Sequence, residues 1–223
     1  MQTARPLRAS PAPSPPSRTE RRSSVGAQAV PFVGLTGGMG AGKSTALSAL
    51  RRLGAEVLSS DQVVHELYEG SELRDAVVAR FGAEVAPGGV VDRAAIARRA
   101  FAREEDRAWL EGTVWPLVGA RVASWLEHVR AQEPPPRAAI VEVPLLFEAG
   151  LDGLYDATIA VIADESIRRQ RAAARGHELA DERAARQLSQ EEKANRASYV
   201  VHNDGSEQDL ERELSGVLAK LDA

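Results

Sequence analysis

The sequence predicts an α/β fold with a five-stranded parallel sheet, flanked by helices and extended by a helical insertion and a helical lid. Short apolar runs alternate with helical patterns along most of the chain, which is typical of parallel strands joined by helices. A glycine-rich stretch at residues 37–44 separates the first apolar run from the first helical pattern. The 223 residues, 43% of them apolar, are enough for one large core and a smaller appendage.

The first 29 residues differ in composition from the rest of the chain. They contain five arginines and five prolines, several serines, and no periodic apolar positions. Such a segment cannot recover the entropy of ordering, so we expect residues 1–29 to be a disordered tail and residues 30–223 to form the folded domain. The alternatives are a transit peptide, although the prolines argue against its amphipathic helix, and a start codon placed too far upstream.

Composition also argues against several classes of protein. Without cysteine, the chain can have no disulfide framework, thiolate nucleophile or cysteine-based zinc site. No apolar run approaches the roughly 18 residues that span a bilayer, so no membrane partner is expected. The tail carries five of the 28 basic residues but only one of the 32 acidic residues. The folded part is therefore acidic, and no nucleic-acid partner is expected. A cytoplasmic location fits these features, and so does a monomer.

The stretch "GGMGAGKS", from Gly37 to Ser44, fits the phosphate-binding pattern G-x-x-x-x-G-K-[ST]. The strand candidate "VPFVGLT" precedes it and the helical run "STALSALRRLG" follows it, which is the required context. Glycines let successive backbone N–H groups turn toward the β- and γ-phosphates of ATP, and the start of the helix adds a positive dipole. Lys43 is expected to bridge these phosphates, and Ser44 to place its hydroxyl on Mg²⁺. The alternative is a glycine-rich turn before an ordinary helix.

The rest of the chain indicates which nucleotide-dependent activity this loop serves. The guanine-reading tetrapeptide N-K-x-D of GTPases is absent. Motor and transporter ATPases usually have longer chains, whereas residues 30–223 have the size of a compact small-molecule kinase. The sequence therefore favours a P-loop nucleotide kinase fold.

A second short strand, "AEVLSS", leads to Asp61. The carboxyl ends of the strands line the ligand crevice of an open α/β sheet, so Asp61 is expected to face the bound phosphates. A carboxylate there can accept or orient the proton of an attacking hydroxyl. Asp61 would also make a good helix N-cap before "QVVHELY", and the two roles do not exclude each other. His65, on that helix, is expected to be structural.

The chain from residue 71 to 132 has an almost wholly helical pattern. The runs "SELRDAVVARFG" and "DRAAIARRAFA" are separated by the turn-rich "APGGVV", and Asp92 stands where a helix cap is expected. A third run, "PLVGARVASWLEHV", ends before three prolines. We expect a helical substrate-binding insertion at about residues 62–132.

The remaining strands return the chain to the sheet. "AAIVEV" is a buried strand with Glu142 near its end, where a second carboxylate directed at Mg²⁺ is expected in such folds. "PLLFE" forms the following loop, and Glu148 there either faces the substrate or pairs with an arginine. "DATIAVIA" is predicted as the fourth strand and "YVVHN" as the fifth.

An arginine-rich stretch follows the fourth strand, and we expect a helical lid at about residues 164–198. Arginine and acidic residues at this density usually form a solvated, ion-paired surface. Phosphoryl transfer, however, needs guanidinium groups that neutralise the γ-phosphate, and a lid can supply them. Arg171 and Arg175, one turn apart, are the candidates.

The ordered set of motifs resembles the dephospho-CoA kinase family over nearly all of residues 31–221. The set consists of "GLTGGMGAGKST", "VLSSDQVVHEL", "FG", "VDRAAIARRAF", "VPLLFEAGL", "RRQRAAAR" and "RQLSQEEKANRASYVVHNDG". The resemblance implies a nucleotide core, a CoA-binding helical insertion and a lid. It also implies an enzyme that uses ATP and Mg²⁺ to phosphorylate the ribose 3′-hydroxyl of dephospho-CoA, the last step of coenzyme A synthesis.

Site residues follow from the same resemblance. It makes Asp61 the proposed base, Arg171 and Arg175 the lid arginines, and Asn203 with Gly205 the loop on the adenine side. Lys43 and Arg171 join Asp61 as catalytic candidates, and Ser44 and Glu142 are the candidates for Mg²⁺. The residues that match the ATP loop of the family are Gly37, Gly38, Met39, Gly40, Ala41, Gly42, Lys43, Ser44 and Thr45.

The chain departs from the family pattern at three places. Members often have D-A-D where this chain has Ser59, Ser60 and Asp61, H-P where it has Trp115 and Pro116, and A-D where it has Ala197 and Ser198. Asp61 is retained, so the chemistry is possible. The absence of the first aspartate and of the histidine concerns contacts to the CoA side or to metal, and not the fold.

Two other functions remain open at the level of sequence. A nucleoside or nucleoside-monophosphate kinase would share the loop, but would need no helical block of this length for its smaller acceptor. A nucleotide-sensing binding module would keep the loop and lack turnover. ATP and dephospho-CoA are the expected partners.

Overall fold

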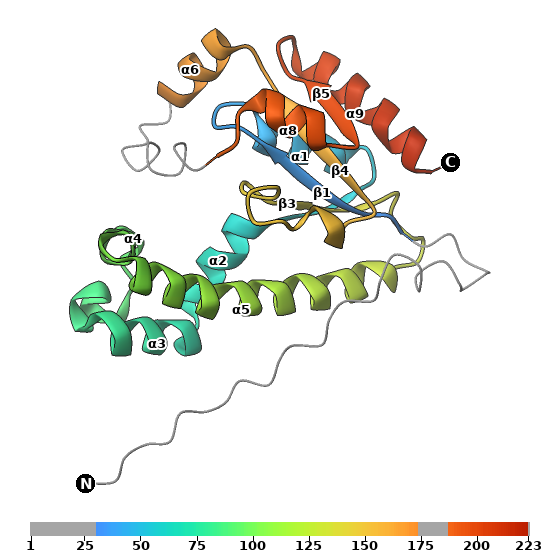
Figure 1. Cartoon of the computed structure of the whole chain (residues 1–223). Coiled ribbons are helices and arrows are strands. Elements are labelled where there is room, and N and C mark those ends of the chain that lie inside the picture. The colour runs from blue at the N-terminus through green and yellow to red at the C-terminus, as the bar shows by residue number, and fades with distance from the viewer. Residues whose placement is uncertain (1–29, 174–186, 223) are drawn as a thin grey trace, which may run out of the picture.

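The computed structural model describes residues 30–173 and 187–222, and it contains a five-stranded, all-parallel sheet in the order β2-β3-β1-β4-β5 (Figure 1). The strand β1 lies at the centre of the sheet, and all six of its residues are buried. The strands are β1 (Phe32–Gly37), β2 (Glu56–Ser59), β3 (Ala139–Glu142), β4 (Ala157–Ile162) and β5 (Tyr199–His202).

The strand register brings the carboxyl ends of the strands to one edge of the sheet. Leu35 of β1 and Ser59 of β2 both lie opposite Glu142 of β3. Gly37, the last residue of β1, lies opposite Val161 near the end of β4. Ligands of open α/β sheets bind at this edge, so the topology places the predicted site residues together.

Helices cover both faces of the sheet. On one face, α1 (Lys43–Arg52) and α9 (Glu207–Leu221) bury Leu50 and Leu214 against Val33 and Leu35. On the other face, the C-terminal half of α5 (Glu104–Arg130) packs Val129 against β3. The short helix α8 (Gln190–Arg196) contacts β1 and β4, whereas α6 (Glu165–Ala173) follows β4.

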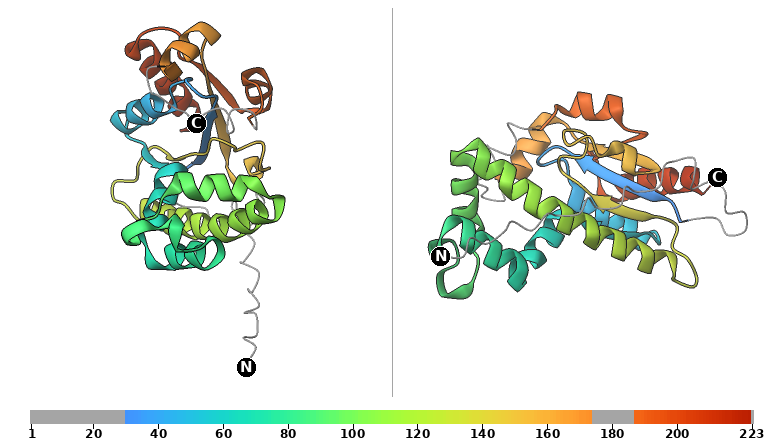
Figure 2. Two further views of the ribbon diagram at one scale, coloured as in Figure 1. Left: turned by 90° about the vertical axis from the view of Figure 1, so that its left-hand side faces the viewer. Right: turned by 60° about the horizontal axis from the view of Figure 1, so that its bottom comes forward.

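The helical insertion comprises α2 (Ser60–Glu69), α3 (Ser71–Phe81), α4 (Arg93–Ala102) and α5, with two short 3₁₀ turns at Ala83–Val85 and Pro87–Gly89. It projects from one side of the sheet (Figures 1 and 2). It has its own hydrophobic core, formed by Tyr68, Leu73, Val77, Phe81, Val85, Ile96, Ala100 and Val114. Residues of α5 pack in this core and against β3, so one helix joins the two parts.

The five predicted parallel strands and the flanking helices are confirmed. Asp92 caps α4 as expected, since its side chain accepts the N–H groups of Ala94 and Ala95. The capping role predicted for Asp61 is wrong, because Ser59 holds the N-cap position and Asp61 is the second residue of α2. The helix α5 extends through Pro116, so it is longer than the sequence run predicted.

The tail, residues 1–29, and the part of the lid at residues 174–186 lie outside the described residues. The boundaries of the insertion and of the lid stay predictions. In the two described ranges, no helix is both long and apolar enough to cross a bilayer.

Candidate active site

The loop between β1 and α1 has a conformation that requires glycine. Gly40 and Gly42 have φ angles of 74° and 92°, where side chains are rarely accepted. A Cβ atom on Gly40 would meet the main chain of Arg168, and one on Gly42 would meet the amide of Asn203. Gly42 is also the N-cap of α1, so the loop delivers its backbone to the positive end of that helix.

Lys43, the first residue of α1, folds back over this loop. Its Nζ donates hydrogen bonds to the carbonyl oxygens of Gly37 at 3.0 Å and Gly38 at 3.4 Å. The same ammonium lies 4.0 Å from Glu142 Oε1. The ammonium group is thus held at the mouth of the loop, where it can exchange its carbonyl partners for the oxygens of a bound phosphate. Ser44 follows it and has an exposed side chain.

Asn203 and Arg171 support the loop from the side of β5. The buried Asn203 donates from Nδ2 to the carbonyl oxygen of Ala41 at 2.8 Å. Arg171, on α6, donates from Nη1 to the carbonyl oxygen of Asn203 at 3.0 Å. The structure therefore brings these two predicted residues together with the loop. Arg175 lies outside the described residues.

Arg168 also contacts the loop and was not among the predicted site residues. Its Nε donates to the carbonyl oxygen of Met39 at 2.9 Å, and its guanidinium lies beside Gly38. Arg168 precedes Arg171 by three residues, so the two share one face of α6. That spacing was visible in the sequence, but the dense ion-pair pattern of the segment hid which arginines face the loop.

Glu142 and Ser59 form a hydrogen-bonded pair at the ends of adjacent strands. The hydroxyl of Ser59 donates to Glu142 Oε2 at 2.7 Å, and the register places the two residues directly opposite each other. Glu142 is buried, so its carboxylate needs these partners. The hydroxyl of Ser59 places no second negative charge beside Glu142.

Asp61 lies in the first turn of α2, immediately after β2, and its side chain lines a cavity of about 410 Å³. The cavity is at the carboxyl edge of the sheet because β2 ends at Ser59, which also lines it. A negatively charged group in the first turn of a helix interacts favourably with the helix dipole. Asp61 thus lies in a cavity at the carboxyl edge of the sheet, and its role toward an acceptor hydroxyl stays a prediction.

The donors near the loop fit Mg²⁺ in the way that nucleotide kinases bind it. Mg²⁺ is usually bound by one or two protein groups together with substrate phosphates and waters, and not by an all-protein cage. Ser44 supplies a hydroxyl and Glu142 a buried carboxylate. Within the described part of the chain, no group of three or more potential metal-ligating side chains is found.

Lys193 is the largest fully buried side chain near the site, and sequence reasoning gave it no role. Its Nζ lies 2.9 Å from Glu148 Oε1 and donates to the carbonyl oxygen of Pro144 at 2.8 Å and to Thr36 Oγ1 at 3.3 Å. Glu148 in turn accepts the N–H of Leu188. Glu148 therefore pairs with a lysine, whereas the sequence left open an arginine or the substrate.

Ser198 and Trp115 are two other positions singled out in the sequence. Ser198 accepts the N–H of Thr158 through its hydroxyl at 3.1 Å, so it joins the start of β5 to β4. Trp115 lies on α5 and remains 54% exposed. Neither residue contacts the phosphate loop.

Comparison with known proteins agrees with this geometry. A family model described as dephospho-CoA kinase matches residues 31–209. A dephospho-CoA kinase of Anaeromyxobacter dehalogenans is 39% identical over 194 residues, which are 85% of this chain and 91% of the relative. One from Deinococcus radiodurans is 37% identical over 216 residues, or 96% and 98% of the two chains.

A solved structure has the same fold. The crystal structure of TT1252 from Thermus thermophilus superposes with a TM-score of 0.73 and 36% sequence identity, covering 86% of this chain and 98% of that one. The phosphate loop and the carboxylates at the strand ends lead to the same family as these similarities. The chain belongs to the dephospho-CoA kinase family.

Proposed function

We propose that the chain transfers the γ-phosphoryl group of ATP to the ribose 3′-hydroxyl of dephospho-CoA, giving coenzyme A and ADP. The observation that carries this proposal is the position of Asp61, which lines a cavity at the same edge of the sheet as the phosphate loop. Membership of the dephospho-CoA kinase family supports the choice of acceptor.

In the reaction, a bond forms between the acceptor oxygen and the γ-phosphorus, and the bond from that phosphorus to the β,γ-bridging oxygen breaks. Asp61 receives or orients the proton of the hydroxyl. Lys43 leaves its carbonyl partners for the β- and γ-phosphate oxygens, while the backbone N–H groups of the loop hold the phosphates. Catalysis then consists of positioning and of charge neutralisation.

Mg²⁺, when bound, would neutralise charge on the β- and γ-phosphates. Ser44 would hold it through its hydroxyl, and Glu142 through water. Ser59 fixes the orientation of Glu142 for this task. Arg171 is the proposed catalytic arginine, and Arg168 is a second candidate because it already contacts the loop.

The helical insertion is proposed to bind the CoA side of the acceptor, and the segment at about residues 164–198 to act as the lid. Gly38 through Thr45, Arg175 and Asn203 are proposed to contact the nucleotide. A cytoplasmic location and a monomeric state stay predictions of the sequence.

An acceptor panel tests the proposal. The full chain is incubated with ATP, Mg²⁺ and one acceptor at a time: dephospho-CoA, adenosine, cytidine or one of the two nucleoside monophosphates. We expect ADP release with dephospho-CoA alone. Turnover only with a nucleoside or its monophosphate would show that the loop binds ATP but that the acceptor is the one of the rival kinase class.

A further inference from the structure

The cavity beside Asp61 contains a positive group as well as a negative one. Its lining residues are Ser59, Asp61, Gln62, His65 and Arg93. The first four come from the end of β2 and from α2, whereas Arg93 comes from the start of α4. A ligand in this cavity would therefore lie between a carboxylate on α2 and a guanidinium on α4.

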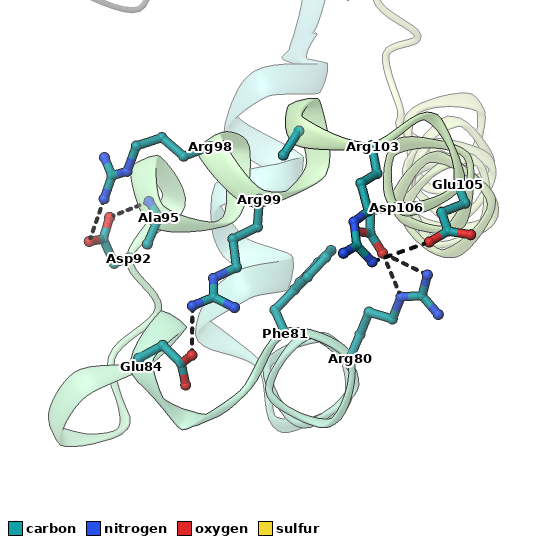
Figure 3. A pocket seen from close by; sticks show the side chains of 11 residues that line it. Arg80, Phe81, Glu84, Asp92, Ala95, Arg98, Arg99, Arg103, Glu105 and Asp106 are labelled. Carbon is teal, nitrogen blue, oxygen red and sulfur yellow. Dashed lines mark hydrogen bonds and ion pairs between the residues drawn. The ribbon is translucent and has the colours of Figure 1, made fainter.

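Arg93 differs from the neighbouring arginines in having no carboxylate partner among the described residues. Its only hydrogen bond joins Nη1 to Nδ1 of His65 at 3.4 Å. On the same helix, Arg98 lies 4.0 Å from Asp92 and Arg99 lies 2.6 Å from Glu84. Figure 3 shows these pairs in the larger cavity of the insertion, where every labelled arginine lies beside a carboxylate.

The position of Arg93 on its helix adds to its affinity for an anion. Arg93 is the first residue of α4, a helix of ten residues, so its guanidinium lies near the positive end of the helix dipole. The side chain of Asp92 satisfies the N–H groups of Ala94 and Ala95. These N–H groups are therefore already hydrogen-bonded, and it is the guanidinium of Arg93 that can attract an anion.

His65 is placed to orient Arg93. Its Nε2 lies 3.6 Å from Glu69 Oε1, and its Nδ1 is the atom that faces Arg93. His65 accepts from Arg93 when Nδ1 carries no proton, and its other ring nitrogen then faces the carboxylate of Glu69. The series Glu69, His65, Arg93 holds the guanidinium at the cavity without neutralising it directly.

We infer that Arg93 binds the 5′-diphosphate of the acceptor while Asp61 faces the 3′-hydroxyl of the same molecule. This inference rests on the proposed function. The diphosphate carries negative charge that Asp61 would repel, and Arg93, which lines the same cavity, supplies the compensating cation. Arg93 would bind substrate directly, and His65 would be a positioning residue.

The test compares Arg93→Gln with the matched control Arg98→Gln in the full chain. One charge-assisted hydrogen bond is lost, so KM for dephospho-CoA should rise about tenfold to hundredfold in Arg93→Gln, with KM for ATP unchanged. Arg98→Gln should behave as the parent. Arg93→Lys should recover part of the affinity, because it keeps the charge and loses the planar fork.

Salt dependence gives a second readout that a structural role would not change. KM of the parent should rise with ionic strength, and that slope should be shallower in Arg93→Gln. An unchanged KM for dephospho-CoA in Arg93→Gln, or an equal loss in Arg98→Gln, would overturn the inference. A parent with no turnover of dephospho-CoA would instead count against the proposed function, so the two failures are distinguishable.

A double-mutant cycle tests the role of His65. His65→Ala should raise KM for dephospho-CoA a few-fold in the parent and have almost no further effect in Arg93→Gln, because the group that it orients is gone. An equal effect in both backgrounds would show that His65 does not act through Arg93.

Discussion

The carboxyl edge of the sheet and the helical insertion use arginine in opposite ways. At the edge, Arg168 and Arg171 donate to main-chain carbonyl oxygens of the phosphate loop and of Asn203. In the insertion, Arg80 and Arg99 pair with carboxylates at 2.6 Å (Figure 3). An arginine that is bound only to carbonyls keeps its charge available for an anion. One that is paired with a carboxylate does not.

The two regions also differ in what stabilises them. The insertion is stabilised by apolar packing of α2 to α5, so it can change surface residues at small cost. The edge of the sheet depends on glycines and on buried polar groups such as Lys193 and Asn203, whose partners are fixed by the fold. Substitutions should therefore have large effects at the edge, where Asp61 also lies, and small effects at the ion-paired surface of the insertion.

The largest effect is expected at Asp61. Asp61→Asn removes the proton acceptor and keeps the shape, so kcat should fall by about 10²–10⁴-fold while the affinity for ATP stays the same. Steady-state kinetics and ATP titration measure the two quantities. Asp75→Asn, at an exposed position of α3, is the control. Unchanged phosphoryl transfer in Asp61→Asn would contradict the assigned role.

The next largest effect is expected at Lys193, on stability. Lys193→Met leaves the carboxylate of Glu148 largely buried and unpaired, which should lower the free energy of unfolding by about 3–5 kcal/mol. Urea denaturation measures it. The exposed Lys220→Met is the control and should change stability little. If both variants unfold at the same urea concentration as the parent, the buried pair does not hold this edge together.

Gly42 should show the next effect. Gly42→Ala forces a side chain into a φ of 92° and against Asn203, which should cost about 1–3 kcal/mol and weaken ATP binding. Gly216→Ala, inside α9 with open space around it, should instead be neutral or stabilise the protein by up to about 1 kcal/mol. Thermal unfolding with and without ATP measures both. Equal behaviour of the two variants would contradict the strained loop.

The smallest effect concerns the N-terminus of α8, the helix that carries Lys193. Hydrogen bonds from the side chain and backbone of Ser189 lower the pKa of Glu192 below its usual value. The stabilisation is present above the pKa of the unfolded chain, near 4.5, and is lost as pH falls through the lower pKa of the folded state. The Tm difference between the parent and Glu192→Gln should therefore shrink on acidification. A difference that grows would contradict this cap.

Much of the edge could be predicted because its features are local. The loop needs glycines and a lysine in a fixed order between a strand and a helix, and the order of strands and helices implies the parallel sheet. Asp61 followed from its place just after a strand, because sequence position alone puts it at the carboxyl edge. Asn203 followed from the resemblance to the family.

The remaining contacts depend on segments that are distant in sequence. Lys193 and Glu148 meet only because α8 packs over the loop after β3, and nothing in either segment identifies the partner. Arg93 resembles Arg98 and Arg99 in the sequence, and only the positions of Asp92 and Glu84 show which arginines are already paired. The capping role expected of Asp61 failed because α2 begins two residues earlier than its pattern suggested.

The most direct measurement identifies the product formed by the full chain from ATP, Mg²⁺ and dephospho-CoA. Mass spectrometry would follow the addition of one phosphate, and phosphorus NMR would locate it. A new phosphomonoester on the ribose 3′-oxygen, formed with equimolar ADP, is the predicted result. No phosphorylated dephospho-CoA, or phosphorylation at another oxygen, would contradict the proposed reaction.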